Sequence, residues 1–210
     1  MARAAPFELH HRRYDEWFVR HAAAYWSELL AVRALLPWQG RGLAVGVGTG
    51  RFAAPLGVRV GIDPARAVLG YARKRGISVV QGVGEALPFT VGAFDHALIV
   101  TTICFFDDAA AALGEVRRVL RPGGRLVIGF IDRDSRLGQG YLSKQAENVF
   151  YREATFFAQG EVAGLLVDAG FAPEAWGQTL SRPLDEIREV EPLRPGLGKG
   201  AFVVVRAVRE

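Results

Sequence analysis

The residues best suited to chemistry are three alternating glycines, Gly46, Gly48 and Gly50. Glycine allows a sharp turn with positive φ, and amides left free at the start of a helix attract an anion. The glycines follow an apolar run, 43–47, which we interpret as a strand. Such a loop predicts a nucleotide-like or carboxylate-bearing ligand without choosing among cofactors. The dinucleotide pattern G-x-G-x-x-G/A fails when counted from Gly46, because Arg51 occupies its last position.

Three further motifs follow the glycine loop. Asp63, before Pro64, closes the apolar run 58–62, and a carboxylate there can accept hydrogen bonds from two vicinal hydroxyls. The alternative is that Asp63 only caps the next helix. Residues 84–89 read Gly-Glu-Ala-Leu-Pro-Phe, where the glutamate is either a ligand or a solvated loop acid. Residues 120–126 read Leu-Arg-Pro-Gly-Gly-Arg-Leu, a tight turn to which we assign no catalytic role.

In this order and spacing, the four motifs resemble the class I S-adenosylmethionine-dependent methyltransferases, in particular the small-molecule branch called methyltransferase type 11. The resemblance covers roughly residues 43–171 and implies S-adenosyl-L-methionine as cofactor and S-adenosyl-L-homocysteine as product. Two positions depart from the pattern: Ala44 replaces an acid in the first strand, and Val83 replaces an aspartate after the third. The implied cofactor-binding residues are Gly46, Val47, Gly48, Gly50, Asp63, Pro64, Gly84, Glu85 and Thr101.

Strand and helix patterns alternate along the chain, which predicts a mostly parallel sheet covered by helices on both faces. Seven strands are expected, at 43–47, 58–62, 77–81, 94–100, 125–131, 175–180 and 201–208. Helices are expected within 7–37 and over 65–75, 108–120 (capped by Asp107) and 161–168. No helical pattern separates the last two strands, so a closing antiparallel hairpin is expected. The fold class is therefore α/β and Rossmann-like.

We expect one domain over residues 1–210, with four parts that differ in role. Residues 1–37 form an N-terminal helical lid, 42–131 the cofactor-binding core, 132–160 an acceptor-side insertion, and 161–210 a C-terminal helix and strand pair. Residues 51–57 allow barely one helical turn between the first two strands, fewer than a crossover usually needs.

The methyl acceptor should bind above the carboxyl ends of the first, fourth and fifth strands, where ligands sit in open α/β sheets. Aromatic side chains from the lid and the insertion suit an apolar or cationic small molecule. The candidates are Tyr14, Trp17, Phe18, Thr102 and Tyr141. Asp132 and Asp134 could orient an amine or activate a hydroxyl. The sequence identifies no residue as a general base, so we assign no catalytic residue.

The composition constrains the partners. The net charge is +4, but the arginines are scattered among acids on expected helices, so nucleic acid is not the expected partner. No apolar run is long enough to cross a membrane, and the single cysteine, Cys104, offers neither a disulfide framework nor a cysteine-built metal site. We expect a cytoplasmic enzyme without a metal, and its oligomeric state stays open. The alternatives are an RNA or protein methyltransferase, a degenerate cofactor-binding protein, and a nicotinamide oxidoreductase.

Overall fold

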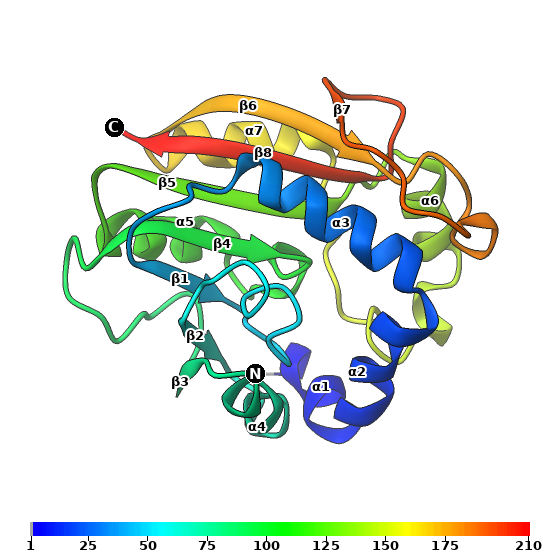
Figure 1. The fold of residues 1–210 in the computed structure, drawn as a ribbon, viewed down its shortest axis with the longest axis horizontal. Helices are drawn as coiled ribbons and strands as arrows, with labels where there is room; N and C mark the ends of the chain where they lie inside the picture. Colours follow the sequence, from blue (N-terminus) through cyan, green and yellow to red (C-terminus); the bar gives the residue numbers. More distant parts are fainter. Residues whose placement is uncertain (1) are drawn as a thin grey trace.

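A computed structural model describes residues 2–210 and places eight strands in one sheet, in the order β3-β2-β1-β4-β5-β8-β6-β7 (Figure 1). The first five strands of that order are parallel, β8 runs antiparallel to both β5 and β6, and β7 runs antiparallel to β6. The strands are β1 (Gly42–Val45), β2 (Val60–Asp63), β3 (Ser78–Gln81), β4 (Phe94–Val100), β5 (Leu120–Ile131), β6 (Phe171–Thr179), β7 (Arg194–Pro195) and β8 (Phe202–Arg209).

The Rossmann-like α/β class and the antiparallel closing strands are confirmed. The expected count of seven strands is wrong by one, because the two-residue β7 pairs with the edge of β6. A second detail also differs from expectation: Asp108, rather than Asp107, caps α5 (Ala109–Val119), since its carboxylate accepts from the amide of Ala111.

Helices cover both faces of the sheet (Figure 1). On one face α3 (Ala22–Leu35) packs against β5 and β8, and α4 (Arg66–Lys74) packs against β2 and β3; both helices contribute to one buried apolar cluster. On the other face α5 and α7 (Gln159–Asp168) form a second cluster with the opposite sides of the same strands. The alternation within β4 explains the division, because Leu98 belongs to the first cluster and Ile99 to the second.

The N-terminal helices and α6 lie at the edge of the sheet where the parallel strands end (Figure 1). The single periodic stretch expected over 7–37 divides into α1 (Ala5–Leu9), α2 (His11–Arg20) and α3, after a short 3₁₀ turn, η1 (Ala2–Ala4). The segment after β5 is more ordered than its sequence indicates, since it holds α6 (Arg136–Ser143) and η3 (Gln145–Glu147). Two further short turns are η2 (Ile103–Phe105) and η4 (Leu184–Glu186).

The connection between β1 and β2 contains no α-helix: residues 51–57 form successive turns, as their small number predicts. Buried Phe52 and Leu56 nevertheless anchor these turns in the first apolar cluster. None of the helices over residues 2–210 combines the length and the apolar character that crossing a bilayer requires.

Candidate functional site

The glycine loop turns sharply out of β1 and is tied to the end of β2. Gly46, Gly48 and Gly50 all have positive φ, at 70°, 53° and 82°. The amides of Gly46 and Val47 donate to the carbonyl of Ile62 at 2.8 and 2.9 Å. A Cβ on Gly46 would collide with the side chain of Thr102, and one on Gly48 would press against the Tyr14 hydroxyl oxygen at 3.2 Å. Glycine is therefore required for both the conformation and the space.

Asp63 joins this loop to the start of α4. One carboxylate oxygen accepts from the amide of Gly48 at 2.9 Å, and the other accepts from the amide of Ala65 at 2.9 Å. Burial raises the pKa of Asp63 to about 6, although these two hydrogen bonds act in the opposite direction. Asp63 therefore caps the start of α4 and, at the same time, lines a large cavity that can hold a ligand.

A cavity of about 360 Å³ lies along the carboxyl ends of the parallel strands. Its volume is within the range typical of small-molecule sites. One end, which we call the Asp63 end, is built after β2 and β3 and is lined by Asp63, Pro64, Val68 and residues 82–85. The opposite end, called the Glu28 end, is built from α3, α6 and the segments after β5 and β6. Its lining residues include His21, Glu28, Ile131, Leu137, Tyr141, Leu180 and Leu184.

Aromatic rings from the N-terminal helices cover the cavity. Phe7 packs edge-on against Tyr14 at 5.1 Å and against Phe105 at 5.0 Å between ring centroids, and it contacts Phe150 at 5.4 Å. The guanidinium of Arg3 donates to the carbonyl of Phe106 at 2.6 Å. These contacts hold η1, α1 and α2 against the loops after β4 and η3, so the helices form a roof over the site.

A charged cluster fastens the same roof to the glycine loop. Asp15 on α2 accepts from Arg51 at 3.0 and 2.7 Å and from Arg75 at 3.0 Å. Arg75 also donates to the carbonyl of Thr49 within the loop at 2.7 Å. Burial alone would favour a neutral Asp15, but the hydrogen bonds from the two arginines outweigh it and hold the pKa of this carboxyl below its ordinary value.

Glu28 is a buried acid of the cavity lining that could not be selected from the sequence. Its side chain is only 3% exposed, and burial raises its pKa to about 8. Among residues 2–210 no hydrogen bond or ion pair engages its carboxylate. The only sequence signal is an isolated acid in a helix that is otherwise almost apolar. That signal does not reveal whether the residue faces a cavity.

The structure brings most of the expected site residues together. Those lining the cavity are Gly46, Gly48, Asp63, Pro64, Gly84, Glu85, Thr101, Tyr14, Trp17, Phe18, Thr102 and Tyr141. Val47 and Gly50 lie outside its lining, because the Val47 side chain packs at Gly61 and Gly50 abuts Ile77. Glu85 also has a structural role, since its carboxylate accepts from the amide of Asp107 at 2.8 Å.

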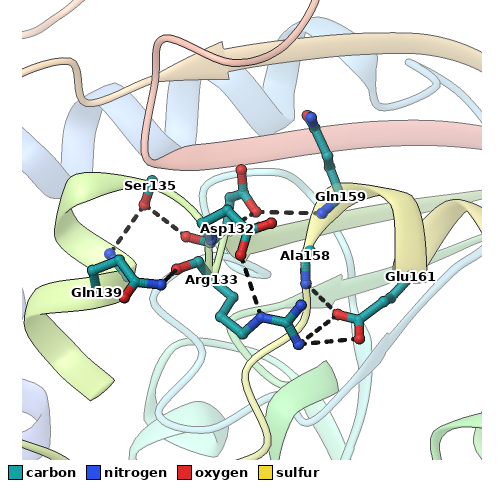
Figure 2. A network of polar contacts seen from close by, with 9 residues as sticks. Asp132, Arg133, Ser135, Gln139, Ala158, Gln159 and Glu161 are labelled. Carbon is teal, nitrogen blue, oxygen red and sulfur yellow. Dashed lines mark hydrogen bonds and ion pairs between the residues drawn. The ribbon is translucent and has the colours of Figure 1, made fainter. Parts of the chain in front are cut away.

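Asp132 and Asp134 do not line the cavity, contrary to the suggested role in handling an acceptor. Figure 2 shows Asp132 inside a polar network in which its carboxylate accepts from the amide of Gln159 at 3.3 Å and its carbonyl from the hydroxyl of Ser135 at 2.6 Å. Arg133 completes the network through an ion pair with Glu161 at 2.9 Å. The network joins the end of β5 to the starts of α6 and α7.

The cavity fits S-adenosylmethionine. A carboxylate able to accept from ribose hydroxyls borders the Asp63 end, and Gly46 and Gly48 bring backbone without side chains to the cavity lining. Gly84 likewise has no room for a Cβ, which would lie 2.7 Å from the Phe106 ring. Of the two departures, Ala44 is a core residue of β1 outside this cavity, whereas Val83 lines it.

Comparisons with known proteins agree with this geometry. Residues 43–128 match the model of a family described as "Methyltransferase domain". A solved structure from Thermotoga maritima, described as an S-adenosylmethionine-dependent methyltransferase and possible histamine N-methyltransferase, is 45% identical with a TM-score of 0.96. The alignment covers 99% of this chain and 100% of that one.

Two curated relatives extend the comparison. An uncharacterized protein from Methanocaldococcus jannaschii is 39% identical over 96% of this chain and 97% of its own length. A demethylmenaquinone methyltransferase from Thermus thermophilus is 42% identical over a shorter region, covering 41% of this chain and 44% of that protein. With the fold, the glycine loop and the cavity, these similarities show that the chain belongs to the type 11 family of class I S-adenosylmethionine-dependent methyltransferases.

Proposed function

We propose that this methyltransferase acts on a small-molecule acceptor, with the cofactor at the Asp63 end of the cavity and the acceptor at the Glu28 end. The observation that carries the proposal is the roofed cavity itself. Rings from α1 and α2 close over it, and Asp15 fastens α2 to the glycine loop. A folded RNA or protein would not fit beneath this roof, whereas a small molecule and a cofactor would.

The domain division follows from the same proposal. Residues 1–37 act as the lid, 42–131 hold the cofactor and 132–160 complete the acceptor side, while 161–210 close the sheet. The cofactor's sulfonium would supply an activated methyl group, so the protein mainly aligns the acceptor and excludes water. Tyr14, Trp17 and Phe18 contribute to that exclusion because they roof the cavity. We expect the enzyme in the cytoplasm.

The proposed residue roles divide along the cavity. Asp63, Gly46 and Gly48 bind the cofactor together with Pro64 and Gly84, and Thr101 borders it from the end of β4. Tyr141 and Thr102 contact the acceptor. Two relatives support a small acceptor by their names, since the Thermotoga protein is called a possible histamine N-methyltransferase and the Thermus protein acts on demethylmenaquinone.

The partition of a labelled methyl group tests this proposal. The protein is incubated with methyl-labelled S-adenosylmethionine and three separated acceptor pools: metabolites, RNA and proteins. We expect label in the metabolite pool that depends on the enzyme and is lost in Asp63→Ala. Label confined to RNA or protein would refute the small-molecule assignment. Transfer to none of the pools by a protein that binds S-adenosylhomocysteine would favour the degenerate alternative.

A further inference from the structure

The carboxyl group of Glu28 is buried at the acceptor end of the cavity and has no hydrogen-bond or ion-pair partner among residues 2–210. Its side chain is 3% exposed, and α3 carries it into the cavity lining. Burying a carboxyl without a hydrogen bond is costly, and an ionised one costs more. Such a group persists where its complement arrives with a ligand, which is the usual pattern of a functional site.

The surroundings of Glu28 indicate the chemistry of that complement. Aromatic residues from other elements line the same cavity: Trp17 on α2, Tyr141 on α6, and Tyr151 beyond η3. Tyr141 and Tyr151 pack against each other at 4.9 Å between centroids. Aromatic ring faces attract cations, and a carboxylate pairs with them. A basic nitrogen would satisfy both features, whereas a neutral hydroxyl can donate a hydrogen bond to the carboxylate but brings no positive charge to it or to the ring faces.

The cavity's positive groups do not neutralise Glu28. Arg3 is engaged by the Phe106 carbonyl and by Asp107 at 3.6 Å. Arg13 lies over the Phe150 ring at 5.8 Å, and Arg20 is an exposed residue of α2. His21 is the remaining basic group, and burial with the nearby Arg20 charge lowers its pKa, so it is neutral near pH 7.

From this geometry we propose that Glu28 is the acceptor-binding residue, and that it selects small molecules carrying a basic nitrogen, an amine or an imidazole, by pairing with that nitrogen. The proposal rests on the proposed function, since it names the acceptor class of the same cavity. The nitrogen shares its proton with one Glu28 oxygen. If that nitrogen is also the methyl acceptor, the proton passes to Glu28, and the lone pair of the nitrogen becomes available to attack the methyl group.

The titratable groups around Glu28 define a proton signature for this pairing. Tyr14, Tyr25, Tyr141 and Tyr151 have pKa values raised chiefly by burial and stay neutral. Glu28 is mostly protonated near pH 7, because burial raises its pKa to about 8. Binding a protonated amine then releases a proton of Glu28 to solvent, while binding the corresponding alcohol releases none.

The test uses the whole protein saturated with S-adenosylhomocysteine. The ligand panel pairs each amine with the alcohol of the same carbon skeleton. It includes 2-phenylethylamine with 2-phenylethanol, and histamine with its alcohol analogue. Isothermal calorimetry in two buffers of different ionisation enthalpy gives both the affinity and the proton release. The variants are Glu28→Gln, Glu28→Asp and, as control, Glu16→Gln, which alters an exposed acid on α2. Thermal melting confirms that each variant is folded.

We expect at least one amine to bind about tenfold or more tightly than its alcohol. This difference in affinity is the contribution expected from one charge-assisted hydrogen bond. The preference and the proton release should vanish in Glu28→Gln, persist in Glu16→Gln and be partly retained in Glu28→Asp. Equal binding of amines and alcohols, an amine preference that survives in Glu28→Gln, or no binding by any panel member would overturn the proposal. Failure of the proposed function would give a different result. In the labelling experiment the methyl group would enter RNA or protein, or the protein would not bind S-adenosylhomocysteine at all.

Discussion

Removing the charge of Asp15 should open the roof of the site without unfolding the sheet. Asp15 on α2 holds two cations, Arg51 of the glycine loop and Arg75 after α4, through three hydrogen bonds of 2.7 to 3.0 Å. In Asp15→Asn both guanidinium groups lose their anionic partner. Because this cluster joins α2 to the core and lies outside the sheet, the cost should appear as local opening of α1 and α2.

The magnitude follows from the exposure of the cluster. Breaking a fully buried ion pair costs about 3–5 kcal/mol, and an exposed pair is worth at most about 1 kcal/mol. The Asp15 side chain is 12% exposed and the arginines 25% and 26%, so we place the cost between these limits, at about 2 kcal/mol. That value corresponds to roughly thirtyfold faster hydrogen exchange for amides protected only by the closed roof.

Hydrogen exchange followed by mass spectrometry measures the effect. Peptides from α1 and α2 should exchange about thirtyfold faster in Asp15→Asn, while peptides from β4 and β5 keep their rates. Glu16→Gln, on the same helix but exposed, should leave both regions unchanged. Equal acceleration in the roof and the sheet would mean that the cluster stabilises the whole domain. Unchanged roof exchange would refute its role as a fastening.

Two further predictions concern stability. Burial raises the pKa of Glu28 in the folded protein to about 8, above the ordinary value of 4.5. The folded protein therefore binds this proton more tightly, and the native state loses stability as pH rises between those values. Glu28→Gln should therefore melt at a higher temperature than the wild type near pH 9, and the difference in melting temperature should vanish near pH 4. Scanning calorimetry across this pH range measures it. A difference in melting temperature that does not depend on pH would contradict the burial of an unpaired acid. Gly46→Ala should lower the unfolding free energy measured by urea titration by at least about 1 kcal/mol, because position 46 combines a positive φ with a collision at Thr102. Gly57→Ala is the control: position 57 has the positive φ but no close neighbour, so this substitution should cost less.

The fold was largely predictable because its signals are local. β-Branched runs such as the one in β8 mark buried strands, and the positive-φ glycines after β1 and α4 mark turns that other residues would strain. The two-residue β7 was not predictable, since Arg194 and Pro195 carry no strand pattern and pair only because β6 offers a free edge. The choice of Asp108 over Asp107 as cap depends on one residue of register, which propensity does not resolve.

The site divides in the same way. Asp63 and the glycine loop could be found because the backbone geometry they serve demands those residue types. Glu28 could not, because helical periodicity does not distinguish an acid facing a cavity from one facing solvent. Its environment forms only when α3 lies opposite Tyr141 and Tyr151, more than a hundred residues away in sequence. Asp132 illustrates the converse, since an acid placed after β5 by sequence caps local backbone instead.

The central claim, that the Asp63 end of the cavity holds the cofactor, is tested most directly by calorimetric titration of the protein with S-adenosylhomocysteine and, in parallel, with NAD. We predict one S-adenosylhomocysteine site per chain, no heat with NAD, and at least about tenfold weaker binding in folded Asp63→Asn, which removes a charge-assisted acceptor. Heat with NAD alone, or an affinity for S-adenosylhomocysteine unchanged in Asp63→Asn, would contradict the account.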